Sequence, residues 1–210
     1  LGLENENATG VINAVDYISQ LRQSNSLADL PVGKRVVVIG GGMTAIDMAT
    51  QIRLLGADEV TLVYRRGKEA MNASKDEQEF TQVKGVTIRY NAKPRRIQTN
   101  EGQIFGIEFE STRNDTSGRL EGTGETFSLP ADMIFKAIGQ VFETPSNCKF
   151  ELDKGRIQVD EQRKTSVAGV WAGGDCATGG DDLTVTAVAE GRDAAMDIHN
   201  VLVGSSNGKS

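Results

Sequence analysis

The stretch that decides the fold runs from Val36 to Ala45 and reads VVVIGGGMTA. A continuous run of β-branched residues is typical of a strand that is buried on both faces of a parallel sheet. Glycines follow this run at once, and residues 43–55 then repeat apolar side chains with the period of a helix. The stretch therefore predicts a strand, a tight turn and a helix, which together open a βαβ unit.

The glycine turn matches the dinucleotide-binding pattern GxGxxG/A at Gly40, Gly42 and Ala45. Gly40 would allow the tight turn, Gly42 would let a pyrophosphate approach the backbone, and Ala45 would let helix and strand pack closely. Met43 and Thr44 open the helix, whose first N–H groups and positive dipole end would face the phosphates. A tight strand-to-helix turn that binds no ligand is the alternative.

Two arginines end the second strand of this unit, in the sequence VTLVYRRGKE from Val60 to Glu69. NAD-selective folds usually place an acidic residue there to bind the ribose hydroxyls. Arg65 and Arg66, next to Tyr64, could instead bind the 2′-phosphate of NADP through bidentate hydrogen bonds. We therefore expect NADP as the ligand, with two alternatives: solvated loop cations, or an arginine stacked on the adenine of NAD.

The residues around this unit complete an α/β pattern. Residues 10–24 predict an amphipathic helix with Val11, Val15, Ile18 and Leu21 on one face, and residues 75–84 predict another helix before a third parallel strand, GVTIRY. From Pro94 to Lys136 the period changes to two, with turn signals at residues 100–102 and 114–124, and a strand returns to the parallel sheet at residues 133–137. The fold class is therefore α/β: a Rossmann-like NAD(P)-binding lobe with a parallel sheet and an antiparallel β-meander.

A second glycine-rich stretch, TSVAGVWAGGDCATGG, occupies residues 165–180. It predicts a short strand at residues 169–172, a turn, and a long helix from about Leu183. It resembles the C-terminal segment of two-dinucleotide flavoproteins, in which the aspartate of a GD pair binds FAD. A carboxylate such as Asp175 can accept hydrogen bonds from ribityl hydroxyls, and a helix dipole stabilises negative charge on a reduced flavin. The alternative is that Asp175 only caps the last helix.

Composition excludes several classes of function. The 210 residues are 38% hydrophobic and 25% charged with a net charge of −6, which fits a soluble α/β protein and gives no reason to expect nucleic acid as a partner. The sequence has no apolar run long enough to span a membrane, so no membrane partner and a cytoplasmic location are expected. Cys148 and Cys176 form no CxxC pair, which argues against an iron–sulfur cluster, a metal site or a redox disulfide in this chain. His199 is the only histidine, so a histidine-based catalytic dyad is not expected.

Five segments taken together resemble the glutamate synthase small-subunit family, which includes the flavin-bearing region of dihydropyrimidine dehydrogenases. They read GVINAVDYI, GKRVVVIGGGMTAID, VTLVYRRGKEAMNAS, FKAIGQ and GGDCATGGDDLTVTAVAEGRDAA. The resemblance implies FAD in one lobe and NADPH or NADH in a lobe inserted into it. It also implies hydride transfer from nicotinamide to flavin, with electrons passing on to an iron–sulfur or catalytic partner subunit or domain. Because this chemistry belongs to the cofactors, no acid–base catalytic residue is predicted.

The resemblance also assigns residues. The glycine turn would hold the NAD(P) pyrophosphate and the two arginines the 2′-phosphate, while Ala137 and Gly139 lie in the AIGQ motif that returns the chain to the FAD lobe. Gly174 and Asp175 would contact FAD, with Thr184 and Val185 beside the flavin ring. The chain departs from the family at Asn72, where many relatives have proline, so NADH-using relatives remain an alternative. It also has neither a first FAD fingerprint nor a cysteine-rich cluster region.

These assignments predict four segments. Residues 1–30 would be a helix and linker of the FAD lobe, 31–140 the NAD(P)-binding domain, 141–203 a C-terminal segment of the FAD lobe, and 204–210 a disordered tail. The chain begins at Leu1, and we expect a fragment of a longer polypeptide with an incomplete FAD site that is inactive alone. The alternative function is a non-catalytic dinucleotide-binding or regulatory module.

Overall fold

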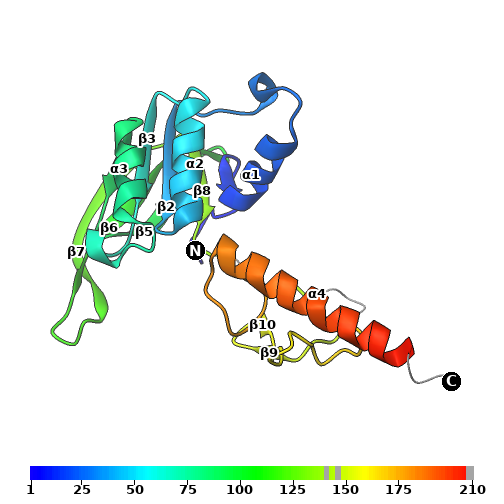
Figure 1. The fold of residues 1–210 in the computed structure, drawn as a ribbon. Helices are drawn as coiled ribbons and strands as arrows, with labels where there is room; N and C mark the ends of the chain where they lie inside the picture. Colours follow the sequence, from blue (N-terminus) through cyan, green and yellow to red (C-terminus); the bar gives the residue numbers. More distant parts are fainter. Residues whose placement is uncertain (140–141, 145–147, 207–210) are drawn as a thin grey trace. The chain divides into compact units, whose positions relative to one another are not determined.

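The structure is a computed structural model that describes residues 1–139, 142–144 and 148–206 (Figure 1). The chain divides into two compact units, Leu1–Gly139 and residues 140–210. The first unit contains the parallel sheet and the second contains the long C-terminal helix. In the part of the chain that the structure describes, no helix combines the length and the apolar character needed to cross a membrane.

A five-stranded parallel sheet forms the centre of the first unit, with strand order β1-β8-β2-β3-β4. Its strands are β1 (Val11–Asn13), β2 (Arg35–Gly40), β3 (Glu59–Val63), β4 (Val86–Arg89) and β8 (Met133–Ala137). Its helices are α1 (Ala14–Gln23), α2 (Met43–Leu54) and α3 (Lys75–Val83), with single 3₁₀ turns η1 (Leu27–Asp29) and η2 (Lys68–Ala70). The predicted strand–turn–helix–strand unit is therefore present as β2, α2 and β3.

Helix α2 packs against one face of the parallel sheet, and an antiparallel sheet covers the opposite face. The antiparallel sheet consists of β5 (Ala92–Asn100), β6 (Gln103–Asn114) and β7 (Leu120–Pro130) in that order. The predicted α/β class, with a parallel sheet and an antiparallel meander, is confirmed. The second hairpin turn is shorter than predicted: β7 begins at Leu120 because Asp115 Oδ1 accepts hydrogen bonds from the backbone N–H groups of Ser117 and Arg119, which closes the turn early.

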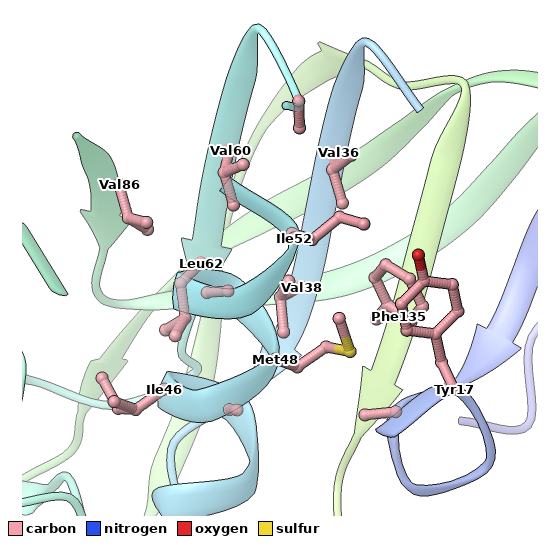
Figure 2. Packing of buried hydrophobic residues seen from close by; sticks show 14 of the residues in the cluster. Tyr17, Val36, Val38, Ile46, Met48, Ile52, Val60, Leu62, Val86 and Phe135 are labelled. Carbon is pink, nitrogen blue, oxygen red and sulfur yellow. The ribbon is translucent and has the colours of Figure 1, made fainter. Parts of the chain in front are cut away.

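The first unit has three layers: the helices, the parallel sheet and the antiparallel sheet. The side chains of β2 alternate between the two cores that join these layers. Val36 and Val38 pack with α2 in one core, while Val37 and Ile39 pack with the antiparallel sheet in a second core. Figure 2 shows the first core, where side chains of α2 lie against the parallel strands. Because successive side chains of a strand point to opposite faces, a continuous apolar run can fill both cores, as expected from the sequence.

The first residues of the chain differ from the prediction. Residues 11–13 form strand β1, which pairs in parallel with β8, and the helix begins only at Ala14. The helix buries Tyr17, whose ring packs edge to face against that of Phe135 with the ring centroids 5.0 Å apart, while Val15 is exposed. Residues 1–30, predicted to belong to the FAD lobe, thus lie in the first unit, because β1 adds an edge strand to the parallel sheet.

The second unit consists of a hairpin, a long loop and one helix. The hairpin pairs β9 (Leu152–Asp153) with β10 (Arg156–Ile157), and the helix is α4 (Thr184–Ser206). The predicted strand at residues 169–172 is wrong: Trp171 forms an isolated bridge with Lys164. Helix α4 continues through residues 204–206, the first part of the predicted tail, and residues 207–210 lie outside the described residues.

Asp197 ties the loop of the second unit to α4, and its titration should be visible in fluorescence. Its Oδ2 accepts a hydrogen bond from Trp171 Nε1 at 2.8 Å and lies 3.0 Å from Lys164 Nζ. The indole hydrogen bond, and after it the lysine, lower the pKa of Asp197 from its ordinary value of 3.8. A lowered pKa means that the carboxylate stabilises the fold fully above pH 3.8 and that this stabilisation is lost as the pH falls through the lowered value.

Trp171 is the only tryptophan, so its emission reports on this contact directly. We expect an acid titration to change the tryptophan emission of the wild-type chain in a step below pH 3.8. The same titration of Asp197→Asn should show no such step. Asp193→Asn is the matched control, because Asp193 pairs with Arg192 on the same helix and should leave the step in place. The same emission change in Asp197→Asn and in the wild-type chain would contradict this assignment.

Candidate functional site

A cavity of about 740 Å³ lies in the first unit at the carboxyl ends of the parallel strands. Its lining includes the glycine turn 40–42 with Thr44, the residues Tyr64, Arg65 and Arg66 after β3, and residues 137–139 at the end of β8. Ligands of open α/β sheets characteristically bind outside the carboxyl ends of the strands. The structure thus brings together, around one cavity, most of the residues that the sequence predicts for a pyridine nucleotide.

The three glycines of the turn have different surroundings. A Cβ at Gly40 would overlap the carbonyl oxygen of Ala137, and a Cβ at Gly41 would overlap the ring of Tyr64. At Gly42 the position of a Cβ is open, with no described atom within 4 Å. Gly40 and Gly41 are therefore required by packing within the protein, whereas Gly42 leaves space on the side of the cavity.

The helix α2 begins directly at the cavity. Gly42 is its N-cap and has no side chain to cap the helix, and its carbonyl accepts from the N–H groups of Ala45 and Ile46 at 3.0 and 3.3 Å. Ala45 is fully buried beneath the turn, as its predicted packing role requires, while Thr44 lines the cavity and Met43 is 46% exposed. The N-terminus of α2 therefore offers backbone N–H groups and a positive dipole end to an anion.

Tyr64 holds the glycine turn in place, a role that the sequence did not indicate. Its hydroxyl donates to the carbonyl of Ala70 at 2.6 Å, and its ring closes over Gly41. The carbonyl of Gly41 in turn accepts from the N–H groups of Asn72 and Ala73 at 3.0 and 3.2 Å. The segment after β3 therefore fixes the turn that would carry the phosphates.

Arg65 and Arg66 are exposed at the rim of this cavity. Among residues 1–139, 142–144 and 148–206, no carboxylate forms an ion pair with either guanidinium group. Two free guanidinium groups are a suitable partner for a phosphate, because each can donate two parallel hydrogen bonds.

The antiparallel sheet adds lining residues that the sequence analysis missed. Lys93, Pro94 and Leu120 come from β5 and β7, and Asn72 and Ile138 from the loops beside the turn. Lys93 Nζ lies 3.0 Å from Glu110 Oε2, and this hydrogen bond lowers the pKa of Glu110. No local motif marks Lys93, Pro94 and Leu120, because they reach the cavity through the stacking of two sheets.

The AIGQ motif contributes to the cavity through its backbone. Ala137 and Gly139 line it, and the Ala137 carbonyl is the group against which Gly40 packs. The last residue of the motif, at position 140, lies outside the described residues.

In the second unit, the GGD turn packs against the first turns of α4. Gly174 has a φ of 77°, which favours glycine, and a Cβ there would lie 3.3 Å from the Cβ of Ala187. Asp175 is exposed beside this turn, and Thr184 and Val185 are exposed at the helix start, Val185 by 74%. Three of the four predicted residues, Asp175, Thr184 and Val185, are therefore accessible to a ligand, and Gly174 is half-buried.

A buried carboxylate, Glu190, holds this turn and was also missed. It is 3% exposed, its Oε2 accepts from the Gly174 N–H at 2.6 Å, and its Oε1 lies 2.8 Å from Arg163 Nη2. A charge in the middle of a helix gives no local sign that it is buried and paired. Only the fold reveals that Glu190 fixes the backbone just before Asp175.

Comparison with known proteins agrees with this geometry. Residues 3–191 match the model of the family described as pyridine nucleotide-disulphide oxidoreductase. The chain is 37% identical over 224 residues to the glutamate synthase [NADPH] small chain of Escherichia coli (strain K12), covering 96% of this chain and 47% of that protein. It is 35% identical over 210 residues to the NADP(+)-dependent formate dehydrogenase subunit beta of Moorella thermoacetica, covering 95% of this chain and 29% of that protein.

Among solved structures, thioredoxin reductase from T. acidophilum has the same fold, with a TM-score of 0.74 and 22% identity. The match covers 97% of this chain and 62% of that one. The predicted resemblance to the glutamate synthase small subunit is confirmed by these matches. The chain spans about half the length, or less, of the curated relatives described here.

Proposed function

The chain belongs to the pyridine nucleotide-disulphide oxidoreductase family, and from this membership we propose that it forms the nucleotide-binding part of an NAD(P)H-dependent flavoprotein oxidoreductase. The observation that carries the proposal is the open position at Gly42, at the N-terminus of α2 and beside a cavity of about 740 Å³. A pyrophosphate needs close access to backbone N–H groups, and a side chain at this position would block it.

Within this proposal, different residues bind different parts of the nucleotide. Gly42, Thr44 and the first N–H groups of α2 bind the pyrophosphate, and Gly40, Gly41 and Ala45 shape the turn by packing. Arg65 and Arg66 bind the 2′-phosphate, which makes NADPH the preferred ligand over NADH. Both curated relatives described above carry NADP or NADPH in their names, which supports this preference.

The second unit supplies groups for the flavin. Gly174 and Asp175 would contact FAD, and Thr184 and Val185 at the start of α4 would lie beside its ring. The exposure of Asp175, Thr184 and Val185 is compatible with that role. Bound FAD would supply the acceptor for hydride from the nicotinamide, and this chain would supply orientation and electrostatic stabilisation. Two relatives are subunits by their names, and we propose that electrons leave for a partner subunit or domain.

Disulfide exchange of the thioredoxin-reductase kind is disfavoured for these 210 residues. The sequence contains two cysteines, Cys148 and Cys176, and no CxxC pair. Both are free thiols in the structure. The second candidate is therefore of another class: a module that binds a dinucleotide without turnover.

One experiment separates the two candidates. The purified 210-residue chain is mixed with NADPH and a dye that serves as an artificial electron acceptor, with and without added FAD. Nucleotide binding is measured on the same preparation by calorimetry. Dye reduction that depends on FAD supports the oxidoreductase. Nucleotide binding without any dye reduction supports the binding module, and the absence of binding contradicts both.

A further inference from the structure

We propose that Thr112, on strand β6, is a positioning residue that sets the preference for NADPH over NADH. It would do so by holding the backbone of the arginine turn, residues 64–67, in the orientation that a 2′-phosphate requires. This inference rests on the proposed function, because it assumes that Arg65 and Arg66 bind that phosphate. Thr112 lies in the antiparallel sheet, 47 positions after Arg65, and no nucleotide-binding motif contains it.

The contact between Thr112 and the arginine turn is short, and on the Thr112 side it is buried. Thr112 is 5% exposed, and its Oγ1 donates to the backbone carbonyl of Arg65 at 2.7 Å. Its own N–H donates to the carbonyl of Asn91 at 2.8 Å, which fixes the strand against the β4–β5 connection. Removing the hydroxyl would leave the Arg65 carbonyl without this donor, which is the costly case for a hydrogen bond.

The other carbonyls of the arginine turn are held by backbone groups. The Tyr64 carbonyl accepts from the N–H of Ala92 at 3.1 Å, and the Arg66 carbonyl accepts from the N–H of Asn91 at 3.1 Å. Asn91 has a φ of 56°, in the left-handed region that asparagine tolerates better than most residues. Of these three carbonyls, that of Arg65 is the one held by a side chain, so it is the one that a point substitution can release.

Releasing this carbonyl should affect the 2′-phosphate and spare the pyrophosphate. A bidentate arginine–phosphate pair depends on the direction in which the guanidinium approaches, and that direction is set by the backbone of the turn. The glycine turn is held by the Asn72 N–H to the Gly41 carbonyl and by the ring of Tyr64, and the Tyr64 carbonyl keeps its own backbone donor, the Ala92 N–H, when the Thr112 hydroxyl is lost. The loss of the Thr112 hydroxyl should therefore change selectivity between the nucleotides more than overall affinity.

The test measures dissociation constants for NADPH and for NADH by calorimetry on the full 210-residue chain. We expect Thr112→Val, which keeps the shape of the side chain but removes the hydroxyl, to reduce the preference for NADPH about fivefold, the equivalent of one hydrogen bond of about 1 kcal/mol. Affinity for NADH should stay unchanged. Thr112→Ser should retain the preference, because it retains the donor.

Thr81→Val is the matched control. Thr81 is fully buried, and its hydroxyl meets that of Thr50 at 2.9 Å between α2 and α3. The same substitution there should lower the melting temperature and leave the preference for NADPH intact. If Thr112→Val does not fold, Thr112→Ala is measured with the same expectation.

Two results would overturn the inference alone: an unchanged preference in Thr112→Val, or an equal loss of affinity for both nucleotides, which would assign Thr112 a structural role only. A wild-type chain that binds neither nucleotide, or binds both equally, would overturn the 2′-phosphate assignment and this inference together.

Discussion

Gly42→Val is expected to abolish the binding of both NADPH and NADH while the chain still folds, with a small loss of stability because valine is a poorer N-cap than glycine. Gly42 has a φ of −96° and a ψ of −179°, an extended conformation that valine adopts readily. A Cβ there meets no described atom within 4 Å outside its chain neighbours, so the side chain begins in open space. The added methyl groups would instead occupy the space that a pyrophosphate needs, and we expect a loss of at least 100-fold, or about 3 kcal/mol.

Calorimetric titration with each nucleotide measures this loss, and thermal unfolding measures stability in parallel. Gly191→Val is the matched control, because Gly191 is also open on its Cβ side but belongs to α4 of the second unit and is not among the residues that line the cavity. Nucleotide binding that survives in Gly42→Val would show that the pyrophosphate does not approach this turn. A large fall in melting temperature would show that the substitution acts through the fold.

The double substitution of Arg65 and Arg66 by alanine should weaken NADPH binding by 10-fold to 100-fold or more and leave NADH binding unchanged. A hydrogen bond to a charged group contributes about 1.5–3 kcal/mol, and the two guanidinium groups lie exposed at the rim of the cavity without a carboxylate partner among the described residues. NADH lacks the 2′-phosphate and therefore gains nothing from them.

The chain offers a close control for this double variant. Arg95 and Arg96 are also adjacent and exposed, and their replacement by alanine removes the same charge from β5, where Arg96 pairs with Glu108. That variant should bind NADPH as the wild-type chain does, if the effect requires more than a change in net charge. If the Arg65 and Arg66 variant keeps its affinity for NADPH while Gly42→Val loses it, the pyrophosphate assignment stands and the 2′-phosphate assignment is wrong.

The sequence predicted the βαβ unit well, because its signals are local and strong. The run from Val36 to Ile39 could only be buried on both faces, and the structure fills one core with two of these side chains and a second core with the other two. The start of the first helix was predicted less well. Val11 fits the helical period, but residues 11–13 form a strand because β8 offers them an edge to pair with.

The cavity could be predicted only in part, for a similar reason. Gly42 lies in the glycine turn, and Arg65 and Arg66 follow at the end of the second strand of the same βαβ unit. This local spacing is enough to predict a dinucleotide site. Tyr64 over Gly41, Lys93 on the rim and Thr112 beneath the arginine turn depend on which strand lies over which, and that order follows from tertiary packing. In the second unit, the predicted strand at Trp171 is a single bridge to Lys164. The indole is held instead by Asp197 of α4, a contact that depends on tertiary packing.

The most direct measurement is calorimetric titration of the wild-type chain with NADPH and then with NADH at one fixed ionic strength. We predict binding of both, with NADPH preferred by tenfold or more, about 1.4 kcal/mol. Equal affinity, or a preference for NADH, would contradict the assignment of Arg65 and Arg66 to the 2′-phosphate. Binding of neither nucleotide would contradict the assignment of the cavity itself.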